Sequence, residues 1–98
     1  MWQLSALPAV EDDLVEASLW YEDKRTGLGD EFITEYLAAV RRIVDNPLMF
    51  AVGSNRLRPC RLKRFTWIIH FKIDANQILI VAVMGAERDE SAFINRRR

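Results

Sequence analysis

The chain has 98 residues, and half of them are apolar or aromatic, which is enough for one domain that buries about two-thirds of its unfolded surface. It contains one cysteine, Cys60, and one histidine, His70, so an internal disulfide and the multi-ligand sites of zinc or iron are excluded, and we expect no metal and no cofactor. No segment approaches the ~18 consecutive apolar residues of a membrane span, and the acidic N-terminal region lacks the basic flank of a signal peptide, so we expect a cytoplasmic protein with no membrane partner.

The formal net charge is zero, but the charges are separated along the chain. Residues 1–45 hold ten acidic and four basic residues, whereas residues 46–98 hold four acidic and ten basic residues. This separation favours an anionic or acidic-peptide partner for the C-terminal half. The alternative is that the two halves neutralise each other within the fold.

The N-terminal half predicts a short strand followed by a helix. Residues 2–7 form an apolar segment that ends at Pro8, and proline suits the first turn of a helix. Apolar residues then recur at spacings of three and four as far as Tyr21, so a helix is expected to end near Arg25.

The Gly27-Leu28-Gly29 turn is expected to supply the left-handed C-cap of the first helix, and a second helix should follow with Asp30 as its cap. Its apolar repeat begins at Phe32 and stops at Asn46-Pro47. Because the connection is short, the two helices should form an antiparallel hairpin.

Three strands are predicted in the C-terminal half, over residues 56–62, 66–73 and 78–83. The middle strand alternates, with Trp67, Ile69, Phe71 and Ile73 on the core face and Thr66, Ile68, His70 and Lys72 on the exposed face. Pro59 lacks an N–H group and places the first of the three strands at a sheet edge or a bulge. The tail Arg96-Arg97-Arg98 is expected to be solvated.

The resulting order is β-α-α-β-β-β. It predicts an α+β fold in which an N-terminal αα-hairpin packs on a curved, mainly antiparallel four-stranded sheet, as one domain over residues 1–98.

Few residues of the sequence are candidates for catalysis or for binding an anion. His70 is a weak candidate acid or base, and the alternative is an ordinary surface histidine; nothing in the sequence aims Cys60 at it. Arg88 either forms a structural ion pair with its neighbour Glu87 or Asp89 or with a helix carboxylate, or joins Arg61 in holding a phosphate or a partner's carboxylate.

The chain resembles the RelE/ParE superfamily of bacterial type II toxin-antitoxin toxins. The resemblance covers nearly the whole chain and rests on motifs at family spacing: Asp13-Leu14, Glu16-Ala17, Trp20-Tyr21-Glu22, Gly27-Leu28-Gly29 with Phe32 and Glu35, Ile43, Asn46-Pro47, Phe50, Arg61-Leu62, Arg64-Phe65-Thr66-Trp67, Ile80, Ala82-Val83 and Arg88-Asp89. It implies the same β-α-α-β-β-β fold, a plasmid-stabilisation type of system, and a cognate antitoxin that binds the toxin as a hetero-oligomer.

The superfamily contains ribosome-dependent mRNA endonucleases and inhibitors of DNA gyrase. In an ungapped alignment, the places where the nuclease branch carries two arginines and a tyrosine hold Ile68, Glu87 and Phe93 here; a shift of one residue would place Arg88 at the second arginine but would not supply the other two. Gly85 stands where many members have a histidine. The resemblance therefore favours the ParE-like branch and a toxin that binds and inhibits gyrase. The alternatives are a RelE-like mRNA endonuclease on the ribosome and a non-toxic, degenerate member.

The candidate binding residues are basic or aromatic. For the target or a nucleic acid we predict Arg61, Lys63, Arg64 and Arg88, and for an acidic segment of the antitoxin we predict Arg58, Arg61, Arg64 and Trp67. No catalytic residue is assigned beyond the weak candidates His70 and Arg88.

Overall fold

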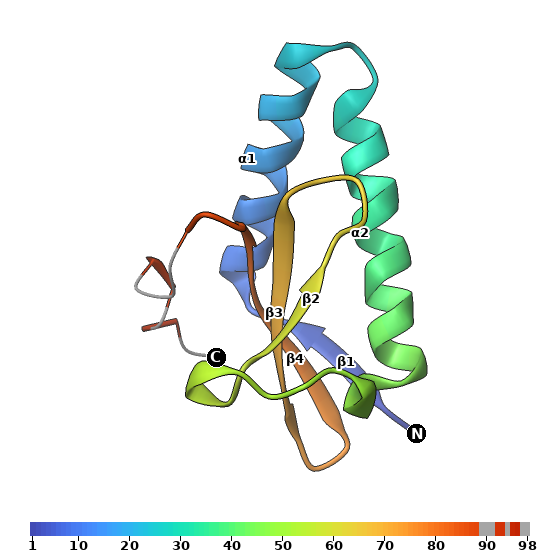
Figure 1. Ribbon diagram of the computed structural model, residues 1–98, viewed down its shortest axis with the longest axis vertical. Coiled ribbons are helices and arrows are strands. Elements are labelled where there is room, and N and C mark those ends of the chain that lie inside the picture. The colour runs from blue at the N-terminus through green and yellow to red at the C-terminus, as the bar shows by residue number, and fades with distance from the viewer. Residues whose placement is uncertain (89–91, 94, 97–98) are drawn as a thin grey trace.

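The computed structural model describes residues 1–88, 92, 93, 95 and 96 (Figure 1). Its elements are β1 (Gln3–Ala6), α1 (Pro8–Lys24), α2 (Leu28–Asp45), the 3₁₀ turns η1 (Pro47–Met49) and η2 (Ser54–Arg56), β2 (Arg58–Arg61), β3 (Trp67–Asp74) and β4 (Gln77–Gly85). This order confirms the predicted β-α-α-β-β-β arrangement and the α+β class. Within the described residues, neither helix is both long enough and apolar enough to cross a bilayer.

The four strands form one sheet in the order β1-β4-β3-β2. The pairs β4–β3 and β3–β2 are antiparallel, whereas β1 runs parallel to β4 with Gln3 opposite Gln77. A register shift lies between His70 and Phe71, where β4 contributes one additional residue. The prediction of a mainly antiparallel sheet is therefore confirmed.

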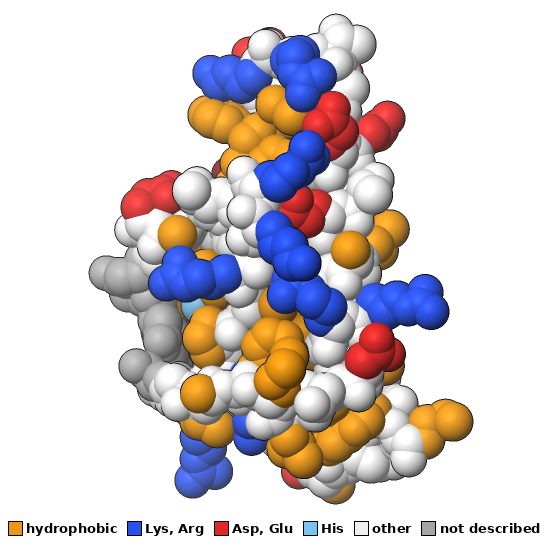
Figure 2. All heavy atoms as spheres, turned by 45° about the vertical axis from the view of Figure 1, so that its right-hand side comes forward, with side chains coloured by type: hydrophobic (Ala, Val, Ile, Leu, Met, Phe, Trp, Pro, Cys, Tyr) orange, Lys and Arg blue, Asp and Glu red, His pale blue; other side chains and the backbone are white. Residues whose placement is uncertain are grey.

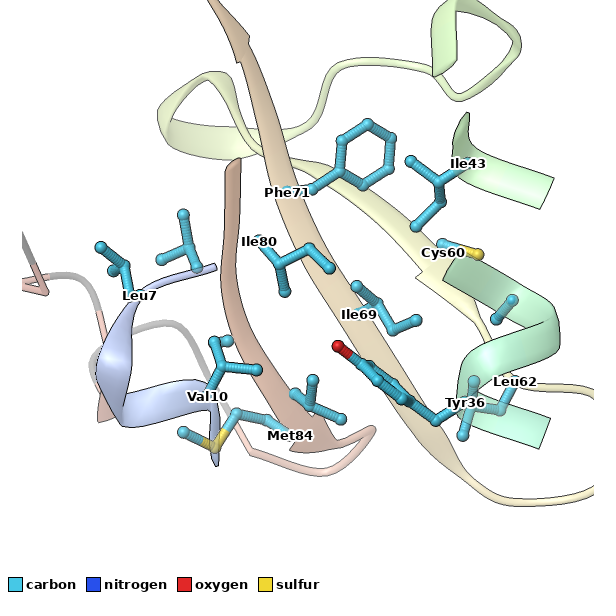
Figure 3. Close-up of a cluster of buried hydrophobic side chains, with 14 of the residues drawn as sticks. Leu7, Val10, Tyr36, Ile43, Cys60, Leu62, Ile69, Phe71, Ile80 and Met84 are labelled. Carbon is cyan, nitrogen blue, oxygen red and sulfur yellow. The ribbon is translucent and has the colours of Figure 1, made fainter. Parts of the chain in front are cut away.

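Both helices cover the same face of the sheet, and the tip of their hairpin extends beyond it (Figure 1). Phe32 and Ile43 from α2 and Ile69 and Phe71 from β3 have no exposed surface, which confirms the predicted core faces. Figure 3 shows the side chain of Cys60 directed into this core, near Ile43. The apolar stripes of the helices and the alternating face of β3 thus meet in one layer.

The second face of the sheet is less open than predicted. Ile68 on this face is only 8% exposed, and the ring of Phe93 packs 4.6 Å from the ring of His70. Phe93 itself is 2% exposed. The expectation of an exposed His70 face was wrong because a residue after β4 returns to cover it.

The caps at the turn between the helices differ from the prediction. Gly27 is left-handed, with φ of 89°, but it is the N-cap of α2, which starts at Leu28, so Asp30 lies inside the first turn, three residues after the cap. The C-cap of α1 is Arg25, which is extended and not left-handed. The capping group is the carboxylate of Glu22, which accepts hydrogen bonds from the N–H groups of Gly27 at 2.9 Å and Gly29 at 3.0 Å. Glu22 therefore satisfies two of the amides that a helix N-terminus leaves without partners.

The outer edge of β4 is completed by two side chains. The strand β1 ends where Ala6 lies opposite Ile80, so the backbone of β4 beyond that point has no neighbouring strand on this side. Asp13 Oδ2 accepts the N–H of Val83 at 3.0 Å, and Arg96 donates to the carbonyl of Val81 at 3.1 Å. The prediction of a solvated tail is thus wrong for Arg96, while Arg97 and Arg98 lie outside the described residues.

Candidate functional site

The strand β2 and the loop that follows it carry all the predicted basic residues except Arg88. Figure 2 shows Lys and Arg side chains following one another down one face of the molecule, with acidic side chains among them. Arg61, Lys63 and Arg64 line one small hollow of about 180 Å³, together with Trp67. The structure therefore brings these four predicted site residues together.

Arg64 is held against α2 and is only partly available to a partner. Its guanidinium forms ion pairs with Glu31 at 3.1 Å and Glu35 at 3.2 Å, and its backbone N–H donates to Glu35 Oε2 at 2.7 Å. Arg25 forms a second ion pair with Glu31, also at 3.1 Å. The ion pairs of Arg64 thus neutralise some of the opposite charge of the two halves within the molecule, whereas the Arg25–Glu31 pair lies within the N-terminal half.

These contacts change the proton affinity of the groups involved. Hydrogen bonds from Arg64 and then Arg25 lower the pKa of Glu31. Burial of Glu35 raises the pKa of its carboxyl, but the backbone and side-chain hydrogen bonds from Arg64 outweigh it, so the net pKa is lowered. The same contacts raise the pKa of Arg64.

The other cations of this region have different roles. Arg58 donates a hydrogen bond of 2.6 Å to the carbonyl of Phe50 and so fixes the segment that precedes β2. The backbone carbonyl of Arg61 accepts from Arg42 at 3.3 Å, while the side chains of Arg61 and Lys63 are exposed. Among the described residues, neither Arg61 nor Lys63 forms an ion pair, so their charges face solvent.

Arg88 does not join this group. It lines a neighbouring cleft of about 290 Å³ between α1 and the ends of β3 and β4, whereas Arg61 lines the hollow beside it, so the two arginines do not line one hollow. Asp89, one of the partners proposed for Arg88, lies outside the described residues. The cleft is lined by Glu16, Ala17, Trp20, Tyr21, Thr66, Trp67, Gly85, Glu87 and Arg88.

Trp67 lies between the two hollows and lines both of them. Its ring packs 5.5 Å from Phe32, and Phe32 lies 5.3 Å from Phe65 and 5.3 Å from Tyr21. Burial raises the pKa of Tyr21, a hydrogen bond from the Trp67 side chain opposes this, and the charge of Glu87 adds to the increase. The aromatic contacts hold the inner wall of the cleft in a fixed position.

The weak catalytic candidates are not arranged for proton transfer. His70 is half-buried and packs on Phe93, whereas Cys60 is 1% exposed and lies on the core face. In the register of the sheet Cys60 pairs with Ile69 and His70 pairs with Pro59, so the two side chains leave opposite faces. Burial raises the pKa of the Cys60 thiol, with the charge of Arg42 as a smaller opposing effect. A Cys60–His70 catalytic pair is therefore excluded.

Asp13, Glu22 and Arg96 were missed as positioning residues. Asp13 and Arg96 are joined by two hydrogen bonds of 2.6 Å and 2.8 Å, which fix the end of the described chain beside a smaller hollow that shares Glu16, Trp67 and Arg88 with the cleft. The sequence contained one signal for Asp13, because this acidic residue lies within the apolar stripe of the first helix. Nothing in the local sequence indicated its partner.

Comparison with known proteins gives the family. Residues 5–90 match the family model described as the ParE toxin of the type II toxin-antitoxin system parDE. The fold is similar to that of a chain in the solved structure described as the chromosomal ParDE TA system from P. aeruginosa, with a TM-score of 0.77, 15% sequence identity, and coverage of 87% of this chain and 96% of that chain. A search of curated proteins found no match. Because the family model spans most of the chain, from β1 to beyond β4, this protein belongs to the ParE toxin family of type II toxin-antitoxin systems.

Proposed function

We propose that the chain is a cytoplasmic toxin that acts by binding DNA gyrase and inhibiting it, and that a cognate antitoxin neutralises it. The observation that carries this proposal is the packing of Phe93 on His70. Phe93 stands where the nuclease branch has a tyrosine, and it has no hydroxyl with which to exchange a proton. It also covers one side of the ring of His70, the histidine that would otherwise be the substitute acid or base.

The neighbouring positions support the same proposal. Ile68, which stands at the place of a nuclease arginine, is 8% exposed and has no charge to place on a phosphate. Glu87 stands at the place of the second arginine and carries the opposite charge. Cleavage of RNA by its 2′-hydroxyl needs both phosphate neutralisation and proton transfer. The side chains at these positions suit binding and not that reaction.

The test is a supercoiling assay with purified gyrase and increasing amounts of the purified chain. We expect supercoiling to stop while a defined transcript, translated on ribosomes and mapped for new 5′ ends, stays intact. Cut RNA with normal supercoiling would reverse the assignment and favour the endonuclease alternative. Normal supercoiling with intact RNA would favour a non-toxic member of the family.

For the antitoxin we propose an acidic segment that covers the exposed cations Arg61 and Lys63. Arg58 and Arg64 lie beside them, but their side chains already bond to Phe50 and to α2, so they contribute less to a new ion pair. Contacts between exposed charges weaken as salt is added. The affinity of the complex should therefore fall with salt concentration, and the double change of Arg61 and Lys63 to Gln should flatten that dependence. An unchanged salt dependence in the double variant would reject this contact.

A further inference from the structure

The cleft between α1 and the ends of β3 and β4 has an aromatic wall that is open to solvent. Trp20 is 55% exposed, and its ring packs edge-on at 5.0 Å against Tyr21, which belongs to the buried aromatic cluster. Trp67 is half-buried and lies in the same cleft. Large aromatic side chains held by a rigid cluster and left accessible are typical of protein-binding surfaces.

The faces of these rings attract cations. Lys24 already places its ammonium 4.6 Å from the centre of the Trp20 ring. Two carboxylates, Glu16 and Glu87, line the cleft, and neither forms an ion pair with Arg88 within the described part of the chain. A planar guanidinium can stack on an indole and pair with a carboxylate at the same time, which an ammonium does less well.

The side of α1 next to the cleft continues this pattern. The 3.6-residue repeat places Asp12, Glu16 and Asp23 along one line of the helix, and all three are exposed. Val15 and Leu19, which are 50% and 64% exposed, lie beside that line. Among the described residues around the cleft and this line, the carboxylates of Asp12, Glu16, Asp23 and Glu87 outnumber the cations Lys24, Arg88 and Arg96, so the surface is both apolar and acidic.

The length of the surface indicates the shape of its partner. The residues from Asp12 to Asp23 extend about 16 Å along the helix axis, the length of three helical turns. A second helix can lie beside α1 at the usual interaxial distance of about 8–10 Å and direct one long side chain into the cleft. Residues 87 and 88, after β4, line the cleft together with Glu16 and Ala17 of α1, and within the described part of the chain no ribbon in Figure 1 runs along the outer side of α1 nearer the hairpin tip.

We propose that the cleft between Trp20 and Trp67 binds an arginine from an amphipathic helix of the antitoxin, with Glu16 and Glu87 as the anionic partners. This inference rests on the proposed function, because that function includes a cognate antitoxin as the binding partner. It adds a second contact surface of opposite charge to the one at Arg61 and Lys63. The antitoxin would then present an acidic segment to the loop between β2 and β3 and a basic helix to α1.

The test uses two synthetic helical peptides of about 16 residues, long enough for four turns. Both carry leucines at spacings of three and four; one has arginine at the flanking positions and the other has glutamate. Each is titrated into the purified chain while tryptophan emission is followed. We expect the arginine peptide to bind and change the emission, and the glutamate peptide to bind at least about tenfold more weakly because its charges face Glu16 and Glu87.

The variants assign the binding to the cleft. The double change Glu16→Gln and Glu87→Gln is expected to weaken the arginine peptide about tenfold, and Trp20→Ala to weaken it by a similar factor or more. Glu11→Gln is the matched control, since it removes the same charge from an exposed position in the first turn of α1 outside the cleft, and it should leave the affinity unchanged. Circular dichroism of each variant confirms that the fold is retained.

Equal binding of both peptides, no binding of either, or unchanged affinity in the double variant would overturn the inference. The supercoiling assay distinguishes this failure from failure of the proposed function. If gyrase is inhibited but the arginine peptide binds no better than the glutamate peptide, the proposed arginine site in the cleft is rejected and the gyrase target is retained. If supercoiling stays normal, and the chain prefers the arginine peptide but loses this preference when Glu16 and Glu87 are changed to Gln, the gyrase target is rejected and the arginine site in the cleft is retained.

Discussion

Asp13 and Arg96 are 83 positions apart in the sequence, and they form a bidentate ion pair that replaces a missing strand at the edge of β4. The carboxylate of Asp13 takes the N–H of Val83, and the guanidinium of Arg96 takes the carbonyl of Val81. A neighbouring strand would bind these same two backbone groups. Where β1 stops, the sheet therefore continues its hydrogen bonding through side chains.

We predict that Asp13→Ala lowers the free energy of unfolding by roughly 2–4 kcal/mol, because it leaves Arg96 and the buried N–H of Val83 without their partner. Arg96→Ala should act in the same direction, and Asp13→Asn should cost less than Asp13→Ala because an amide oxygen can still accept from Val83. Urea unfolding followed by tryptophan fluorescence gives these values. Asp23→Asn is the control at an exposed position of the same helix, and equal stability of Asp13→Ala and Asp23→Asn would contradict the role assigned to the pair.

A second prediction concerns Glu22, whose carboxylate holds the first turn of α2. Glu22→Ala removes the acceptor of two N–H groups and a negative charge at the positive end of the helix dipole, so it should lower the stability by about 1–2 kcal/mol. Glu22→Gln keeps one oxygen acceptor and should lose about half of that. The measurement is again urea unfolding, and Asp30→Ala in the same turn is the comparison, because alanine removes any side-chain cap. A larger loss in Asp30→Ala than in Glu22→Ala would restore the capping role that the sequence had suggested for Asp30.

The close approach of the helices at Gly29 gives a third prediction. A Cβ built at this position would lie 2.5 Å from the backbone oxygen of Ser18, so the two helices must separate to accept any side chain. We expect Gly29→Ala to cost about 1–3 kcal/mol, as overpacking usually does, despite the better helix propensity of alanine. Thermal unfolding tests this, with Thr34→Ala as the control at an exposed position of α2. A rise in melting temperature for Gly29→Ala would show that the helices shift apart without cost.

The order of elements followed from local sequence signals. The strand signal over β3, the stop at Pro47 and the turn at Gly27 each depend on neighbouring residues, and the structure confirms these three elements, although the burial of Ile68 breaks the predicted alternation. The contacts that were missed join distant parts of the chain. Phe93 covering His70, Arg96 on Asp13 and Arg64 on Glu35 depend on how the elements pack, and periodicity within one element carries no information about its partners.

The charge pattern shows the same limit for the candidate site. The sequence separated acidic helices from a basic C-terminal half, and the two interpretations, an anionic partner or internal neutralisation, could not be distinguished. Arg64 and Arg25 pair with α2, whereas Arg61 and Lys63 face solvent without ion pairs among the described residues. Whether each basic residue pairs with α2 or remains available to an anionic partner depends on the direction of its side chain in and near the loop after β2. No local sequence signal predicts this direction.

A fourth prediction follows from the lowered pKa values of Glu31 and Glu35. A carboxyl with a lower pKa in the folded state stabilises the fold above its unfolded pKa, about 4.3 for glutamate, and this contribution is lost as the pH falls through the folded value. The stability of the chain should therefore decrease from pH 6 to pH 3. Arg64→Gln should reduce that decrease, because it removes the main cation that holds both carboxyls ionised.

Urea unfolding at several pH values in this range measures the effect. Lys63→Gln is the matched control, since it removes an adjacent exposed cation whose side chain forms no ion pair within the described residues. Parallel curves for the wild type and Arg64→Gln would mean that the ion pairs with α2 contribute nothing to the pH dependence.

The last prediction is a stabilising change at the turn between β3 and β4. Ala75 has φ of 56°, in the left-handed region, where a Cβ costs about 1–2 kcal/mol. Glycine removes this strain but adds about 0.5–1 kcal/mol of unfolded-state entropy, so Ala75→Gly should raise the stability by roughly 0.5–1 kcal/mol. Ala38→Gly on the exposed side of α2 is the control with the opposite sign, since it should lower the stability by about 1 kcal/mol. A loss of stability in both variants would show that the backbone at Ala75 is not strained, because the entropy of glycine would then be the only effect.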